Sequence, residues 1–256
     1  KMLLKIKKLV KKVLFPEKRE ISVKWIQKDS NAWLVQQFKD AVIKPSQNAF
    51  SKKIEQLAAD TNKQGPQPLW EGYKTGDPTN DRGPTRKAND VRTASTVGDL
   101  YAEIIVKRKP ELVVEFGTAF GVSGMYFLSG LETNKKGELF TYDPNDVWAG
   151  FAKNNLSQIS NRFKLTIGTF EDKIHAHLNN NKKIDVAFID AIHTSEFVFS
   201  QLEIVIARSS PKAIIILDDI NFSEDMKLCW EKVAADPRFS ASASLGNRVG
   251  IVELKQ

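Results

Sequence analysis

The chain has 256 residues, of which 41% are hydrophobic and 27% charged, so it can form one well-buried α/β domain with an appendage and is too apolar to be disordered. A single cysteine, Cys229, excludes a disulfide framework and a cysteine-based zinc cluster, and we expect a cytoplasmic protein. Residues 1–20 carry eight Lys or Arg and two Glu, which accounts for nearly all of the net charge of +7. The remaining body is almost neutral, which argues against a nucleic-acid partner.

The basic leader has apolar residues near helical spacing between its lysines, from Leu3 to Leu14. Such a helix can lie on an anionic membrane surface through residues 1–15, or pack on the protein body or on a second subunit of a homodimer. Packing is the interpretation we favour. No apolar run approaches the roughly 20 residues that a membrane-spanning helix needs.

Residues 1–92 are predicted to form a helical extension that ends in a long loop. Ser30 can cap a helix that Pro45 closes, and Ser46 or Asn48 can begin a second one. The segment 61–92 is rich in glycine and proline but contains Trp70 and Tyr73. A connection of this length is typical of a substrate lid or a linker, and the aromatic residues favour a lid.

Residues 93–256 are predicted to form a second domain, which opens with a helix over 95–108. Five strand-like runs then alternate with helical segments, a pattern typical of βαβ units with a sheet covered on both faces. The runs are 112–116, 139–143, 163–168, 185–190 and 213–219. Two final strands meet at Gly246 without a helix between them and predict an antiparallel hairpin. The fold class is therefore α/β: a Rossmann-like, doubly wound, mostly parallel sheet with a C-terminal antiparallel hairpin and an N-terminal helical extension.

Polar residues follow each strand, where ligands bind in such sheets. After the first strand, Gly117 permits a tight turn and Gly121 permits close approach of helix, sheet and ligand. The loop lacks the Gly-x-Gly-x-x-Gly spacing that seats a pyrophosphate and the Lys of a phosphate-binding P-loop. Asp143 ends the second strand, where a carboxylate can accept hydrogen bonds from both ribose hydroxyls. Together these features predict a nucleoside ligand without a diphosphate.

The order Glu115-x-Gly117-x-x-x-Gly121, Asp143, Asp190 and the terminal strand pair resembles the class I S-adenosylmethionine (SAM)-dependent methyltransferases over about residues 94–256. The resemblance implies a transferase that binds SAM. The residues it assigns to the cofactor are Glu115, Gly117, Thr118, Ala119, Gly121 and Ser123 around the methionine part, Asp143 at the ribose, Phe170 and Glu171 at the adenine, and Asp190.

Asp190 ends the fourth strand, and Asp218 and Asp219 end the fifth. If these strands are neighbours, three carboxylates converge, and a hard cation such as Mg²⁺ is the usual counter-charge. The arrangement resembles the metal-dependent O-methyltransferases of the catechol and macrolide-sugar types, although many members have Asp-Asn where this chain has Asp-Asp. The resemblance implies a metal held by Asp190, Asp218 and Asp219. The structural alternative is a strand-end turn in which Asp219 caps the following helix.

His193 follows Asp190 by three residues, and the macrolide-sugar enzymes have a histidine in the same position relative to that aspartate. Its ordinary pKa near 6.5 suits a general base. We therefore expect a metal-dependent O-methyltransferase that acts on a phenolic, sugar or natural-product hydroxyl, with Asp190 and His193 as the catalytic residues and Trp70, Tyr73 and Trp148 as acceptor walls. The alternatives are a metal-independent methyltransferase, a dinucleotide oxidoreductase, and a non-catalytic domain docked by its basic leader.

Overall fold

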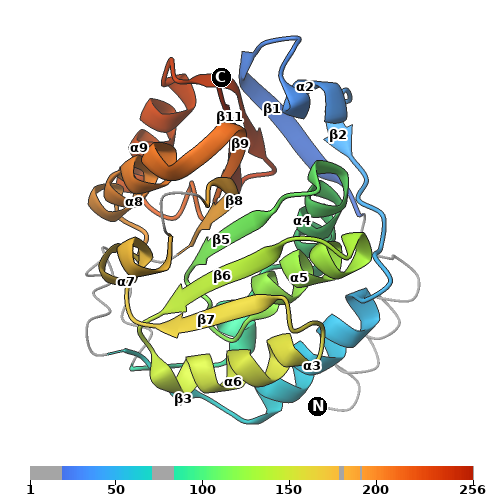
Figure 1. Cartoon of the computed structure of the whole chain (residues 1–256), viewed down its shortest axis with the longest axis vertical. Helices are drawn as coiled ribbons and strands as arrows, with labels where there is room; N and C mark the ends of the chain where they lie inside the picture. The colour runs from blue at the N-terminus through green and yellow to red at the C-terminus, as the bar shows by residue number, and fades with distance from the viewer. Residues whose placement is uncertain (1–18, 71–83, 179–181, 191, 256) are drawn as a thin grey trace, which may run out of the picture.

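The computed structural model describes residues 19–70, 84–178, 182–190 and 192–255. They form a nine-stranded sheet in the order β2-β1-β10-β11-β9-β8-β5-β6-β7 (Figure 1). The strands of this sheet are β1 (Ile21–Lys28), β2 (Val42–Ile43), β5 (Leu112–Phe116), β6 (Glu138–Asp143), β7 (Phe163–Ile167), β8 (Ile184–Ile189), β9 (Ser209–Leu217), β10 (Phe239–Leu245) and β11 (Val249–Leu254). Strands β5 to β9 are parallel, and the other four are antiparallel. The predicted α/β fold class, with its mostly parallel sheet and terminal hairpin, is confirmed.

Helices cover both faces of the sheet, because the parallel strands are apolar on both sides. On one face, the core joins the sheet to α2 (Trp33–Gln37), α3 (Ser51–Lys63), α4 (Ser95–Arg108), α5 (Val122–Asn134) and α6 (Asp146–Ser157). On the other, it joins the sheet to α7 (Phe170–His177), α8 (Ser195–Arg208) and α9 (Glu224–Ala235). A short pair, β3 (Gln67–Pro68) and β4 (Thr85–Arg86), and the 3₁₀ helix η1 (Ala88–Asp90) complete the described elements.

The strand order reverses between β5 and β8, because the chain runs outward through β6 and β7 before it returns to β8 and β9 (Figure 1). Such a reversal opens a crevice beyond the carboxyl ends of the strands, where ligands bind in open α/β sheets. The residues at these ends are those that the sequence marked as candidates for chemistry.

The N-terminal segment differs from the helical extension that we predicted. Residues 21–28 form β1, which pairs antiparallel with β10 and extends the sheet beyond the hairpin. The helix expected from Ser30 to Pro45 is much shorter, since α2 ends at Gln37 and the chain then returns as β2 beside β1. The second predicted helix is present as α3, and Asn48 accepts a hydrogen bond from the backbone of Phe50 just before it. The leader over residues 1–15 and Tyr73 lie outside the described residues.

A distant carboxylate fixes the start of α2. The buried Glu253 of β11 accepts hydrogen bonds from the backbone N–H groups of Trp33 (3.0 Å) and Leu34 (2.7 Å). These are two of the donors that a helix leaves unpaired in its first turn. Because this cap lies on the last strand of the chain, no local sequence pattern indicates where α2 begins.

Replacing Glu253 with alanine should lower the free energy of unfolding by about 3 kcal/mol, since it leaves two backbone donors without their charged acceptor. Chemical denaturation measures this loss. Glu111→Ala is the matched control: Glu111 is 70% exposed and pairs with Lys136 at the surface, so its removal should change the free energy by less than about 0.5 kcal/mol. Equal effects of the two substitutions would contradict the capping role.

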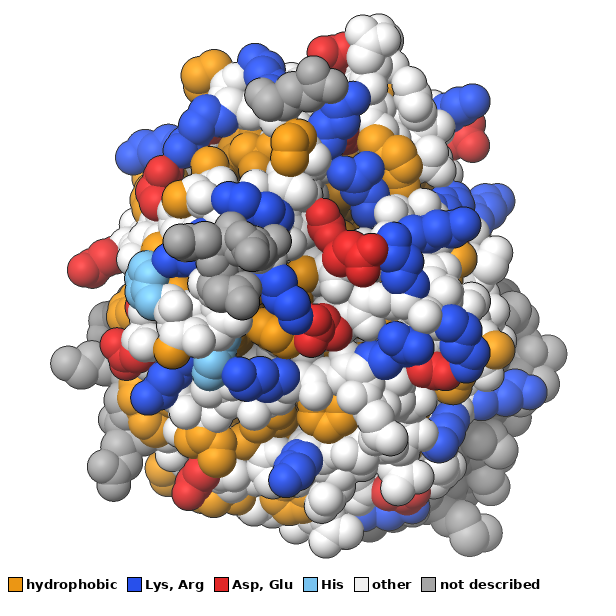
Figure 2. Space-filling model, in the orientation of Figure 1, with side chains coloured by type: hydrophobic (Ala, Val, Ile, Leu, Met, Phe, Trp, Pro, Cys, Tyr) orange, Lys and Arg blue, Asp and Glu red, His pale blue; other side chains and the backbone are white. Residues whose placement is uncertain are grey.

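No helix in the described ranges is both long and apolar enough to cross a membrane. On the face seen in Figure 2, Lys and Arg side chains are interspersed with Asp and Glu rather than gathered into one basic region.

Candidate functional site

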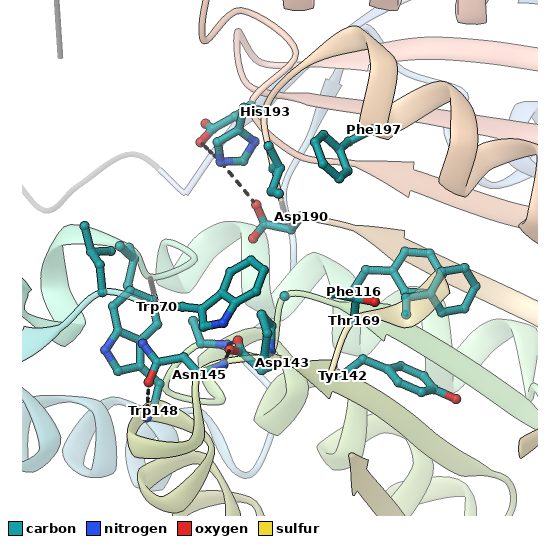
Figure 3. A pocket seen from close by; sticks show the side chains of 18 of the residues that line it. Trp70, Phe116, Tyr142, Asp143, Asn145, Trp148, Thr169, Asp190, His193 and Phe197 are labelled. Carbon is teal, nitrogen blue, oxygen red and sulfur yellow. Dashed lines mark hydrogen bonds and ion pairs between the residues drawn. The ribbon is translucent and has the colours of Figure 1, made fainter. Parts of the chain in front are cut away.

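A cavity of about 370 Å³ lies at the carboxyl ends of β5, β6, β8 and β9. Its size is within the range of small-molecule and cofactor sites. Figure 3 shows Asp190 and His193 on one side of the cavity and Asp143 and Asn145 on the other, with Trp70 between them. Trp70 and Trp148 both line the cavity, as predicted for its walls.

The loop between β5 and α5 has the backbone conformation that its glycines permit. Gly117 and Gly121 have φ angles of +92° and +83°, in the left-handed region that favours glycine. At Gly121, a Cβ atom would lie 3.2 Å from the Cα of Ala152, so α6 packs closely against the loop. Ala119 also has a positive φ, of +45°. An alanine in this conformation needs support from its surroundings.

Asp143 provides that support. Its carboxylate accepts hydrogen bonds from the backbone N–H of Ala119 (2.7 Å) and of Asn145 (2.8 Å). Burial raises the pKa of Asp143 to about 6. Because each carboxylate oxygen has a further lone pair, the group can still accept hydrogen bonds from a ligand in the cavity that it lines.

Glu115 lies beneath the loop rather than in the cavity. It is fully buried and accepts hydrogen bonds from the hydroxyls of Ser123 (2.5 Å) and Thr141 (2.6 Å). Thr118 is hydrogen-bonded to the same Thr141 hydroxyl, and burial raises the pKa of Glu115 to about 7. Glu115 is absent from the residues that line the cavity, and its expected place near the cofactor's amino group stays a prediction. Its hydrogen bonds tie the start of α5 to β6.

The predicted adenine residues lie at the far end of the cavity. Phe170 is buried, with its ring centroid 3.6 Å from that of Phe116 and its ring nearly perpendicular to that of Tyr142. Glu171 accepts a hydrogen bond from Gln201 Nε2 at 2.8 Å. Both predicted residues line the cavity. Phe170 belongs to the hydrophobic core below it, and Glu171 contributes a polar side chain.

At the opposite end, Asp190, His193 and Asp219 each offer one ligand atom within 4.8 Å of the others. Nε2 of His193 lies 3.4 Å from Asp219 Oδ2 and 3.9 Å from Asp190 Oδ1 (Figure 3). The imidazole packs on Phe222, with ring centroids 4.9 Å apart. We call these three side chains the rim cluster.

Asp218 does not belong to the rim cluster. It is buried, and its two oxygens accept hydrogen bonds from Nε (2.9 Å) and Nη2 (2.7 Å) of Arg248. Arg248 Nε also lies 2.9 Å from Asp219 Oδ1. The structure therefore does not bring the three predicted aspartates together as one ligand set, because a guanidinium already binds Asp218 on both oxygens.

Sequence reasoning missed Arg248. The signal was the hairpin: β11 pairs antiparallel with β9, with Gly250 opposite Leu217. Continuing this register sets Arg248 opposite Asp219, and the backbone N–H of Ile220 donates to the Arg248 carbonyl at 2.9 Å. An arginine two residues before that glycine could thus have been placed beside the acidic pair.

Burial and charge have opposite effects on the groups of the rim cluster. Burial lowers the pKa of His193, and the carboxylates of Asp219 and Asp218 oppose this only in part. Burial raises the pKa of Asp190 well above its ordinary value, and the same two carboxylates raise it further. The histidine is therefore neutral at pH 7, the form in which an imidazole can accept a proton or bind a metal.

Comparison with known proteins shows what the domain is similar to. Residues 114–220 match the protein family described as "Methyltransferase domain". No curated protein matches the chain in sequence. Solved structures share its fold at low identity. The O-methyltransferase TomG from Streptomyces achromogenes, involved in tomaymycin synthesis and solved with SAM, is 16% identical, with a TM-score of 0.56 over 65% of this chain and 83% of its own.

Two further structures extend the likeness. The O-methyltransferase from Bacillus cereus, in complex with S-adenosylhomocysteine (SAH), is 19% identical, with a TM-score of 0.58 over 88% of this chain and 98% of its own. The SAH-bound methyltransferase PaMTH1 from Podospora anserina is 17% identical, with a TM-score of 0.56 over 80% of this chain and 96% of its own. Residues 114–220 thus match a methyltransferase domain, and the chain shares the fold of these methyltransferase structures, as its motifs predicted.

Proposed function

We propose that this chain, whose residues 114–220 form a methyltransferase domain, transfers the methyl group of SAM to a hydroxyl of a small molecule. One observation carries the proposal. A single cavity joins a buried carboxylate suited to a ribose, Asp143, to a neutral histidine between two carboxylates, His193. One end therefore fits a nucleoside methyl donor, and the other fits an acceptor that must lose a proton.

The cofactor end is built from the loop and β6. Asp143 would accept hydrogen bonds from the ribose hydroxyls while it holds Ala119 and Asn145 in place. Glu171 and the backbone around Gly168 would meet the adenine, with Phe170 as the floor. The bound SAM and SAH in TomG and in the Bacillus cereus enzyme support this assignment.

At the acceptor end, His193 is the proposed general base. Its Nε2 would accept the proton of the acceptor hydroxyl, and SAM, when bound, would supply the methyl group to the acceptor oxygen and leave as SAH. Phe197, Phe222 and Trp70 line this part of the cavity and suit a flat, partly apolar acceptor. Holding donor and acceptor in line supplies much of the rate enhancement.

The residues present also fit a divalent cation. Asp190 and Asp219 are the proposed ligands, since Mg²⁺ is commonly bound through one or two carboxylates, with waters and substrate completing the shell. When bound, such an ion would stabilise negative charge on the acceptor oxygen. His193 is close enough to be a third ligand, but an imidazole that binds a metal through Nε2 has no lone pair there to accept a proton. We therefore propose His193 as the general base and not as a metal ligand.

Arg248 supports a second candidate, a metal-independent methyltransferase with the same SAM site. The guanidinium lies between Asp218 and Asp219 and supplies positive charge where we had expected only a metal to do so. A chelator separates the two candidates.

The test is a methyl-transfer assay with labelled SAM and a panel of phenols, sugars and hydroxylated natural products, with and without EDTA. Calorimetry with SAH, and with NAD as the control ligand, precedes it. We expect SAH to bind, NAD not to bind, and EDTA to remove transfer that Mg²⁺ or Mn²⁺ restores. Transfer unaffected by EDTA would leave the metal-independent enzyme, and failure to bind SAH would overturn the proposal itself.

The remaining expectations stay predictions of the sequence. They are a cytoplasmic location, no nucleic-acid partner, a homodimer, and membrane contact through residues 1–15 as the alternative role of the leader. The division into 1–92 and 93–256 is one as well. Segment 19–70 is nevertheless bound to the second part, because Arg19, Asn48 and Ser51 all contact the buried Asp99 of α4.

A further inference from the structure

The guanidinium of Arg248 binds two consecutive aspartates, Asp218 and Asp219. Its Nε and Nη2 atoms bind both oxygens of Asp218, and Nε also approaches Oδ1 of Asp219. Paired N–H donors of this kind give a guanidinium a fixed geometry on a carboxylate, which a lysine could not reproduce. The side chain of Asp218 is 3% exposed and that of Arg248 is 47% exposed, so the carboxylate is withdrawn from water while part of the arginine still reaches it.

The two carboxylate oxygens of Asp219 therefore face different groups. Oδ1 lies toward Arg248, and Oδ2 lies 3.4 Å from His193 Nε2, on the side of the rim cluster. Asp219 has a φ of +52°, so the turn after β9 directs this residue away from the regular strand. The two neighbouring aspartates thus differ: among the described residues, the side chain of Asp218 is bound by Arg248, whereas Asp219 also lines the cavity.

We propose that Arg248 is a positioning residue that holds Asp218 away from the rim cluster. Only two carboxylates of the described acidic pair and strand end, Asp190 and Asp219, are then left to bind a divalent cation. This inference rests on the metal-binding part of the proposed function. Arg248 acts in two ways: it occupies both oxygens of a third carboxylate, and its charge offsets part of the negative potential that attracts a cation. Metal affinity depends on the number of charged ligands, so both effects weaken binding.

A second group beneath the cluster supports a small ligand there. The Tyr101 hydroxyl is buried and has no hydrogen-bond partner among the described residues. Its ring is stacked on Phe127 and packs against Phe188, which lies two residues before Asp190. Burial raises the pKa of this phenol, and the carboxylates of Asp218 and Asp190 raise it further. Buried polar groups without a protein partner are usually satisfied by water or an ion.

The test is calorimetry of Mn²⁺ and Mg²⁺ with the full chain, in the absence of SAM, for the native protein, Arg248→Met, Asp218→Asn and the double variant. We expect Arg248→Met to bind Mn²⁺ at least about 10-fold more tightly, because it frees two carboxylate oxygens and one negative charge. Asp218→Asn should stay within about 3-fold of the native affinity. The double variant should return to the native value, which would assign the gain to Asp218.

Thermal unfolding provides a second readout, since Arg248→Met leaves Asp218 buried without its cation. Without metal the variant should melt at a lower temperature than the native chain, and Mn²⁺ should raise its melting temperature by more. Unchanged Mn²⁺ affinity in Arg248→Met, or a tenfold loss in Asp218→Asn, would overturn the inference. If the native chain binds no metal and Arg248→Met does, Arg248 has the inferred role while the metal part of the proposed function fails.

Discussion

Replacing His193 with alanine should lower kcat by about 10²- to 10⁴-fold, the usual contribution of a positioned general base, while the affinity for SAH stays nearly constant. His193 belongs to the acceptor end of the cavity, away from Asp143, so its loss affects proton transfer rather than cofactor binding (Figure 3). Single-turnover transfer of labelled methyl measures the first quantity, and calorimetry with SAH measures the second.

The pH dependence should identify the same group. Burial holds the pKa of His193 below its ordinary value of 6.5, and only the neutral imidazole can take a proton. Native kcat should therefore be level near pH 7 and fall as the pH drops through this lowered pKa. The fall belongs to protonation of the base, so it should be absent from the residual activity of His193→Ala.

His175→Ala is the matched control, because His175 lies on α7 beside Arg208 and outside the cavity. It should leave kcat unchanged. If His193→Ala instead lost Mn²⁺ affinity as severely as Asp219→Ala does, His193 would be a ligand, and the base would have to be sought elsewhere.

The strands and helices from residue 95 onward were predictable because their signals are local. Buried runs such as 112–116, separated by amphipathic segments, indicate βαβ units wherever they occur. Strand β1 was missed although its side chains alternate between buried and exposed as the pattern of a half-buried strand requires. The helical signals around it drew the interpretation toward an all-helical extension.

Only those site residues that lie at the ends of the parallel strands were predictable from the sequence. Asp143 and Asp190 were found because each lies at the carboxyl end of a recognisable strand, and the parallel order of these strands brings the two ends to the same edge of the sheet. The partners of Asp218 and of α2 were not found, since Arg248 and Glu253 reach them from the hairpin through antiparallel pairing. Local sequence patterns do not indicate such contacts. Predicting them requires the residue-by-residue pairing of the antiparallel strands.

Asp143→Ala should weaken SAH binding by about 100-fold, which corresponds to about 3 kcal/mol. Two losses combine: the ribose hydroxyls lose a charged acceptor, whose hydrogen bonds are each worth about 1.5–3 kcal/mol, and Ala119 loses the bond that holds its left-handed conformation. Calorimetry with SAH measures the effect.

The contributions of loop and ribose can be separated with a second variant. Asp143→Asn keeps one acceptor oxygen, either for the loop or for the ribose, and should lose about 10-fold in affinity. Asp146→Ala is the matched control, since this exposed carboxylate in the first turn of α6 does not line the cavity. If Asp143→Ala lowered the melting temperature but bound SAH as tightly as the native chain, Asp143 would serve only the loop. A loss of affinity at an unchanged melting temperature in Asp143→Asn would instead assign the carboxylate directly to the ligand, since an unstable loop could not account for it.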